Sequence, residues 1–147
     1  MAIHLKKAEI SDISALLEIE KSVAGTKIYS PMLTESEWLE EFKKGVIYLI
    51  QKDGVAVGSI SYEKKGEDNA HISGLAVDPK FQGQGIAKEA LTQLLQELKD
   101  MKRIDLVTHP DNVKALKLYE SLGFKVESRK ENYFGDGEPR VVLVLGK

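Results

Sequence analysis

The sequence contains no cysteine among its 147 residues, which excludes disulfide bonds, thiol nucleophiles and thiolate metal sites. This composition suits a reducing compartment. The longest apolar runs, VIYLI at 46–50 and VVLVL at 141–145, span five residues each, whereas a membrane-spanning helix needs about 20. The opening segment, MAIHLKKAEI, lacks the charged-then-apolar pattern of a secretory signal. We therefore expect a cytoplasmic protein that does not associate with a membrane.

Neither sign of charge dominates the chain. The 21 lysine and arginine residues against 23 aspartate and glutamate residues leave a net charge of −2, so no electrostatic feature favours nucleic acid as a partner. The three histidines show no metal-ligand spacing, and we expect no metal and surface positions for His4 and His109. The length predicts a single domain over residues 1–147 that buries about two-thirds of its unfolded surface.

Hydrophobic periodicity predicts an alternation of strands and helices. The predicted strands cover 2–7, 46–52, 55–64, 70–77, 104–108, 124–133 and 140–145. Predicted helices run from Asp12 to near Gly25, from a cap at Thr34 through Phe42, over 86–101 and over 112–122. The dipeptide Asp53-Gly54 predicts a two-residue hairpin turn. The order β-α-α-β-β-β-α-β-α-β-β, with hairpins in the middle and at the end, indicates an α/β fold with a mixed sheet.

A glycine-rich turn, Gln82-Gly83-Gln84-Gly85, joins the 70–77 strand to the 86–101 helix. Such a turn directs free backbone N–H groups and the positive end of the helix dipole at one spot, which suits a phosphate. A dinucleotide fingerprint would need a third glycine where Lys88 stands, and no P-loop pattern is present. A turn that merely redirects the chain is the alternative.

Two sequence blocks resemble the GNAT family of N-acetyltransferases. The string QGQGIA at 82–87 matches that family's [Q/R]-x-x-G-x-[G/A] signature, within LAVDPKFQGQGIAKEAL. The second block, HPDNVKALKLYESLGFKV at 109–126, is similar to the family's fourth helix and the turn that follows it. The resemblance covers essentially the whole chain. It implies a GNAT-type acyl-CoA N-acyltransferase fold: a mixed seven-stranded sheet, about four helices, and fourth and fifth strands that splay apart at a bulge near Gly74.

The resemblance also implies acetyl-CoA as the cosubstrate. Its pyrophosphate is expected on the backbone amides of Gly83, Gln84, Gly85, Ile86, Ala87 and Lys88, with Gln82 bracing the loop or touching a phosphate. Its pantetheine arm is expected along the backbone of Leu75, Ala76 and Val77. Asn112 is expected to cap its own helix and to contact the same arm.

Attack of an amine on a thioester expels a thiolate, which needs a proton. By resemblance, Tyr119 is the general acid, although its spacing alone fits an ordinary amphipathic helix. Relatives of the ribosomal-protein N-terminal acetyltransferase type carry a glutamate base five residues before the motif asparagine, where this chain has Val107. His71 corresponds to a strand position that other members fill with glutamate or histidine. An imidazole with a pKa near 6.5 suits proton relay, and a purely structural histidine is the alternative.

The sequence says less about which amine accepts the acetyl group. An α-amine with a pKa near 7.8 is roughly one-third neutral at about pH 7.5, whereas a lysine amine is only about 0.1% neutral. A weak base therefore favours an α-amine. The terminal hairpin, RKENYFGDGEPRVVLVL, loosely resembles the ending of the ribosomal-protein type, except that Pro139-Arg140 replaces an acidic-small pair. This places Tyr133 beside the acceptor groove, with cross-strand packing as the alternative; Tyr29 is a second acceptor-side candidate.

These residues predict an N-acetyltransferase that moves an acetyl group directly from acetyl-CoA to a primary amine of a peptide, protein N-terminus or small molecule. A monomer or homodimer is expected. The main alternative is a CoA-binding sensor or interaction module without catalysis, suggested by Val107 and the undefined base. A nucleotide-binding protein that uses the same glycine turn is a weaker alternative.

Overall fold

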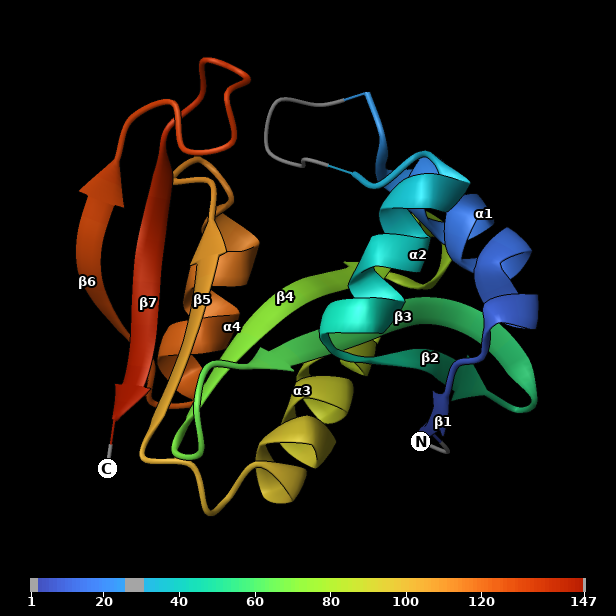
Figure 1. The fold of residues 1–147 in the computed structure, drawn as a ribbon, viewed down its shortest axis with the longest axis horizontal. Helices are drawn as coiled ribbons and strands as arrows, with labels where there is room; N and C mark the ends of the chain where they lie inside the picture. The colour runs from blue at the N-terminus through green and yellow to red at the C-terminus, as the bar shows by residue number, and fades with distance from the viewer. Residues whose placement is uncertain (1–2, 26–30, 147) are drawn as a thin grey trace.

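The computed structural model describes residues 3–25 and 31–146, which form a seven-stranded sheet in the order β1-β2-β3-β4-β5-β7-β6 (Figure 1). Its strands are β1 (Ile3–Lys7), β2 (Val46–Lys52), β3 (Val55–Lys64), β4 (Asn69–Val77), β5 (Arg103–Thr108), β6 (Lys125–Lys130) and β7 (Arg140–Gly146). The α-helices are α1 (Ile13–Val23), α2 (Glu35–Lys44), α3 (Ile86–Glu97) and α4 (Val113–Ser121), and short 3₁₀ turns form η1 (Ile10–Asp12) and η2 (Pro79–Phe81). The predicted order of elements and the mixed α/β sheet are confirmed.

Two of the predicted elements are too long. The apolar stripe predicts a helix to Met101, but α3 ends at Glu97 because Leu98 leaves helical geometry and the chain turns. Met101 stays in the core, so its position in the stripe reflects burial after the turn rather than helix. The strand predicted over 124–133 is shorter in the structure, where β6 ends at Lys130. Asn132 adopts a positive φ of 51°, which a strand does not accommodate.

Helices cover both faces of the sheet. One cluster of buried residues joins α3 and α4 to strand side chains that include Ile60, Ile104 and Leu143. The other cluster joins α1 and α2 to the opposite face, where Ile47 and Leu49 point. Figure 1 shows α1 and α2 in front of the sheet and α3 and α4 behind it. Residues from two separate helix layers, α1 and α2 on one face and α3 and α4 on the other, can therefore contact a group that lies between two strands.

The strands β4 and β5 separate part-way along their length. They pair in parallel only at Asn69–His71 with Arg103–Asp105. Just beyond, β4 is bulged: Ser61 of β3 pairs with Gly74, while Tyr62 pairs with Ile72, so Ser73 is the extra residue. The predicted bulge and splay are therefore confirmed, and the edge of β4 from Ile72 to Val77 has no pairing with β5.

The carboxyl group of Glu20 on α1 is partly buried. Burial raises the pKa of Glu20 to about 7; the carboxylate of Glu37 adds to the rise, and a hydrogen bond with the Met32 backbone opposes it. The ordinary value is 4.5, so the folded protein retains a proton that the unfolded chain releases between these pH values. The stabilising contribution of this proton is fully present below about pH 4.5 and is lost as the pH rises through about 7.

Glu20→Gln is therefore expected to make stability less dependent on pH. Between about pH 5 and pH 8, the free energy of unfolding of the wild-type protein should fall by about 1–3 kcal/mol relative to the variant. Urea denaturation at several pH values measures this difference. Glu18→Gln, at an exposed position of the same helix, is the control and should follow the wild type. An identical pH dependence for Glu20→Gln and the wild type would contradict the expectation.

Candidate active site

A cleft of about 730 Å³ lies between the end of β4, the segment leading into α3 and the start of α4. Its volume is within the roughly 300–1,000 Å³ range typical of small-molecule sites. The cleft is lined by ten of the residues predicted for the site: Leu75, Val77, Gln82, Gly83, Gly85, Ile86, Ala87, Lys88, Asn112 and Tyr119. The fold thus brings separate sequence motifs onto one cavity wall.

The N-terminus of α3 faces this cleft without a side-chain cap. Gly83 and Gly85 have φ angles of 80° and 79°, and Gly85 is the N-cap residue. Because glycine has no side chain, the amide N–H groups of the first turn are not capped by it, in contrast to α2 and α4, which Thr34 and Asn112 cap. Uncapped N–H groups at the positive end of a helix can bind a phosphate or diphosphate.

The two glutamines of the turn point to different partners. Gln82 Nε2 donates a hydrogen bond of 2.9 Å to the carbonyl oxygen of Val77, which ties the turn to the end of β4. Gln84 Oε1 instead accepts a 2.6 Å hydrogen bond from Lys52 Nζ on β2, and Gln84 is not among the residues that line the cleft. The side chain of Ala76 belongs to the core cluster under α1 and α2. Only the backbones of Gln84 and Ala76 are therefore left for the predicted roles.

Asn112 and Tyr119 come from α4. Asn112 Oδ1 accepts a 3.3 Å hydrogen bond from the amide of Ala115, which confirms its predicted N-cap role. Tyr119 is only 8% exposed, yet it lines the cleft, and its ring centroid lies 6.0 Å from that of Phe124. A phenol group is thereby held on an inner wall of the cavity.

His71 forms a close pair with Asp105, a residue that the sequence did not single out. The Nδ1 atom of His71 lies 2.6 Å from Asp105 Oδ1, and Arg103 Nε contacts the other carboxylate oxygen at 3.3 Å. A carboxylate acceptor favours the proton on Nδ1, which leaves the lone pair of a neutral imidazole on Nε2. The pair occupies the last paired position before β4 and β5 separate. His71 does not line the cleft itself.

The side chains of β5 alternate between the two faces of the sheet, which puts Asp105 and Val107 on the same face. Ile104 and Leu106 are buried on the α3 and α4 face, so Asp105 and Val107 point to the α1 and α2 face. Val107, the position at which the family resemblance implies a glutamate, is apolar. An acidic group lies two residues earlier on the same face of the same strand, next to His71.

A second buried carboxylate, Glu41 of α2, reaches the bulge of β4. Glu41 is 9% exposed, and its Oε1 accepts a 2.6 Å hydrogen bond from Ser73 Oγ. Ser73 Oγ also lies 2.9 Å from Ser61 Oγ. Sequence reasoning missed this chain of polar groups, although the position of Glu41 three residues after the buried Trp38 places it on the inner face of α2.

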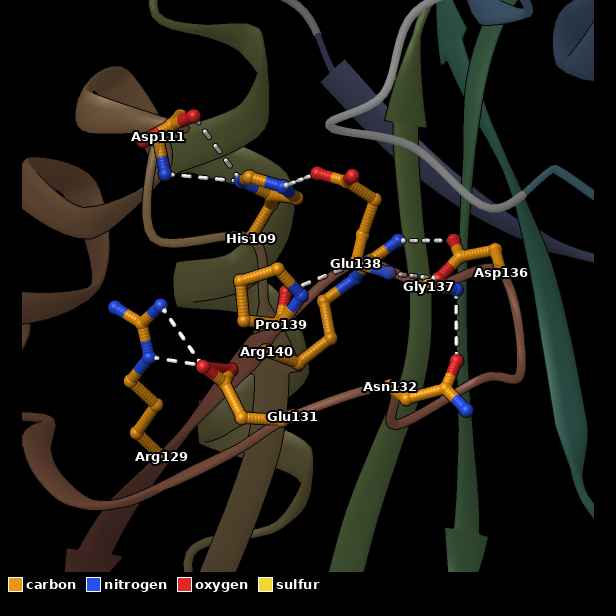
Figure 2. A network of polar contacts seen from close by, with 10 residues as sticks. All are labelled: His109, Asp111, Arg129, Glu131, Asn132, Asp136, Gly137, Glu138, Pro139 and Arg140. Atoms are coloured by element: carbon orange, nitrogen blue, oxygen red, sulfur yellow. Dashed lines mark hydrogen bonds and ion pairs between the residues drawn. The ribbon is translucent and has the colours of Figure 1, made fainter.

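The prediction that His109 is a surface residue is wrong. It is 1% exposed; its Nε2 lies 2.8 Å from Glu138 Oε1, and its Nδ1 accepts a 3.0 Å hydrogen bond from the amide of Asp111 (Figure 2). His109 directly follows β5, so the chain carries it inward under the β6–β7 loop. His4 is exposed, as predicted.

Tyr133, a predicted acceptor-side residue, lies beside Phe134 in the loop between β6 and β7. Tyr133 and Phe134 are 39% and 50% exposed, and their rings stack edge to face with centroids 4.8 Å apart. Tyr133 is not among the residues that line the cleft. Tyr29 lies outside the described residues.

Two further observations concern metal sites and membranes. Over residues 3–25 and 31–146, no group of three or more histidine, aspartate or glutamate side chains is arranged to hold a metal ion. No helix in the same ranges combines the length and apolar character that crossing a membrane requires.

Comparison with known proteins decides the family. A sequence model of the Acetyltransferase (GNAT) family matches residues 13–124. The chain belongs to the GNAT family. The membership predicted from the two motif blocks is thereby confirmed, and the fold of this GNAT protein agrees with it.

Individual GNAT relatives differ in how much of the chain they match. The [ribosomal protein bS18]-alanine N-acetyltransferase of Haemophilus ducreyi is 38% identical over 84 residues, which cover 53% of this chain and 58% of the relative. The chain thus spans little more than half the length of such curated relatives. The L-amino acid N-acetyltransferase AaaT of Escherichia coli is 24% identical over 142 residues, or 89% and 88% of the two chains.

Solved structures support the GNAT fold over the full length. The ribosomal-protein-S18-alanine N-acetyltransferase from Escherichia coli superposes with a TM-score of 0.85 at 23% identity, covering 99% of this chain and 94% of that one. A GNAT acetyltransferase from Elizabethkingia anophelis with acetyl-CoA bound gives a TM-score of 0.78 at 18% identity, covering 99% and 98%. At these identities the similarity establishes the fold alone.

Proposed function

We propose that this protein is an N-acetyltransferase that transfers an acetyl group from acetyl-CoA directly to a primary amine. The observation that carries the proposal is a single cleft that joins the uncapped N-terminus of α3, the unpaired edge of β4 and the phenol of Tyr119. In the proposal these features serve as a diphosphate site, a docking edge for an amide-bearing arm and a proton donor. The family membership and the printed activities of the relatives support the same assignment.

The donor fits the cleft in two parts. The amides of the turn and first helical turn, from Gly83 to Lys88, would hold the diphosphate at the positive end of α3. The edge of β4 at 75–77 has no partner strand on the β5 side, so its N–H and C=O groups can pair with the amides of pantetheine as an added strand would. A β4 amide is also positioned to polarise the thioester carbonyl.

Proton transfer is assigned to groups on opposite sides of the sheet. His71, oriented by Asp105, lies on the α1 and α2 face, and its Nε2 would accept the proton that the attacking amine loses. Tyr119 comes from α4 on the other face and would give its phenolic proton to the departing sulfur. The nucleophile and the leaving group thus meet different residues, and no covalent enzyme intermediate is needed.

We favour an α-amine as the acceptor. Neutral α-amine is present at roughly one part in three near pH 7.5, whereas a lysine side chain would need about 4 kcal/mol to lose its proton there. Position 107 is valine and supplies no carboxylate base. An imidazole base alone is better matched to an α-amine than to a lysine side chain. The names of the relatives, an N-terminal alanine enzyme and an amino-acid enzyme, also indicate α-amines.

The test is release of free CoA thiol from acetyl-CoA with three acceptor sets, followed by mass spectrometry of the products. The sets are peptides with a free N-terminus and no lysine, N-terminally blocked peptides with a free lysine, and free amino acids. Turnover with the first or third set is expected. No thiol release with any amine, together with no acetyl-CoA binding by calorimetry, would overturn the proposal. Tight binding without turnover would instead favour the non-catalytic CoA-binding alternative that Val107 suggests.

Gly83→Ala is expected to weaken acetyl-CoA binding about tenfold or more. An alanine at φ 80° is strained by roughly 1–2 kcal/mol, and its methyl group would project into space that is empty within 4 Å, beside the proposed phosphate site. Gly54→Ala, in the β2–β3 turn, is a matched control because Gly54 has φ 81° and equally open surroundings. Calorimetry should show normal affinity for Gly54→Ala. Equal affinities of the two variants would remove the glycine turn from the donor site.

A further inference from the structure

His109 joins two loops, one of which contributes residues to the wall of the candidate active site. On one side, its Nδ1 holds the amide of Asp111, and on the other its Nε2 bonds Glu138 Oε1 at 2.8 Å (Figure 2). Asp111 and its neighbour Asn112 line the donor cleft. Glu138 belongs to the 131–139 loop between β6 and β7. One buried imidazole therefore links the wall of the cleft to that loop.

The hydrogen bonds specify one form of the ring. Nδ1 faces an amide N–H, so it must present a lone pair, and Nε2 must then carry the proton that is donated to the Glu138 carboxylate. At 1% exposure, water does not replace either partner readily. His109 thus fixes both the distance and the direction between the two loops.

The loop that His109 holds is internally cross-linked. Asp136 accepts hydrogen bonds from the Glu138 amide at 2.9 Å and from Arg140 Nη2 at 3.1 Å, and Gly137 donates to Asn132 Oδ1 at 2.7 Å. Arg140 also lies 5.1 Å from the ring centroid of Phe134. Among described residues, the bond between His109 and Glu138 is the hydrogen bond that ties this unit to the β5–α4 connection. Arg140 belongs to β7 and still holds Asp136 when that tie is lost, so the loss frees the Glu138 side of the loop to move relative to the cleft wall.

We infer that His109 is a positioning residue for the acceptor: by holding Glu138 it keeps the 131–139 loop at a set distance from the donor cleft. The inference rests on the proposed transfer to an amine. The loop presents two exposed aromatic side chains, Tyr133 and Phe134, to a peptide or amino-acid acceptor. Loss of the tie lets this surface drift from the thioester while the donor site stays intact. His109 acts through Glu138 and touches neither substrate.

Two substitutions of His109 separate its bonds. In His109→Asn the amide oxygen can replace Nδ1 toward Asp111, but the side chain is too short to reach Glu138. In His109→Gln the longer amide can place an N–H near the position of Nε2 and restore the link. His109→Asn and Glu138→Ala should raise KM for the acceptor about tenfold and leave KM for acetyl-CoA within about twofold, whereas His109→Gln should recover most of the acceptor KM. The variant that combines His109→Asn with Glu138→Ala should have an acceptor KM no higher than either single variant, because both changes break the same bond.

An unchanged acceptor KM in both His109→Asn and Glu138→Ala would overturn the inference, as would an equal rise in both KM values. Glu138 is about one-third exposed, so Glu138→Ala tests the link even if a His109 variant unfolds. Wild-type turnover tests the proposed function separately. If the wild type shows no turnover, hydrogen exchange of the amides at 132–138 decides the matter: faster exchange in Glu138→Ala supports the tie, and unchanged exchange refutes it.

Discussion

Replacing Tyr119 by phenylalanine is expected to lower kcat for acetyl transfer by about 10²- to 10⁴-fold, the range that general acid catalysis typically contributes. The phenol, the proposed proton donor, lines the cleft next to the unpaired edge of β4. Without it, the thiolate would have to leave unprotonated or draw a proton from water. Steady-state rates over a range of pH, combined with calorimetry of acetyl-CoA, measure the effect. The affinity for acetyl-CoA should stay within about threefold of the wild type, because the phenyl ring and its contact with Phe124 remain.

A matched control for this substitution is Tyr48→Phe on β2. It also removes a phenolic hydroxyl. This hydroxyl donates a hydrogen bond to Glu97 at the end of α3 and has no proposed catalytic role. A small loss of stability with an unchanged kcat is expected there. A Tyr119→Phe protein that keeps the full rate at every pH would take the acid role away from Tyr119.

Removal of the base is expected to have the second-largest effect. His71→Gln should lower kcat/KM for the acceptor by about 10²- to 10³-fold, because the variant has no imidazole to accept the proton of the attacking amine. Asp105→Asn should lower the rate less, since His71 remains but loses the carboxylate that orients Nδ1. Initial rates from about pH 5.5 to pH 9 at saturating acetyl-CoA measure both variants.

Glu127→Gln is the control for the base experiment. It removes the other partner of Arg103, which contacts Glu127 at 2.8 Å, without touching His71. Its rate should match the wild type. If His71→Gln retains the full rate, the base is elsewhere, and the buried Glu41, which bonds Ser73 on the same face, becomes the residue to replace next.

The parts of the protein that were predicted correctly depend on residues close together in the sequence. The 82–88 turn needs only consecutive backbone amides and two glycines, so its signature is legible without tertiary contacts, and Gly83 and Gly85 do adopt positive φ. The hairpin turn at Asp53-Gly54 is similar, because both residues take positive φ as a two-residue turn requires. The bulge next to Gly74 was implied by the family resemblance, which also depends on the local sequence.

The sequence by itself therefore determined the family, the order of the elements and the glycine turn before α3, because these arise from local spacing and from hydrophobic patterns. Only the tertiary structure decided the polar pairs: His71 with Asp105, Glu41 with Ser73, and His109 with Glu138, which are 34, 32 and 29 residues apart. Each pair depends on strand register or on how a helix or loop packs. A shift of one residue would turn the strand side chains of these pairs to the other face.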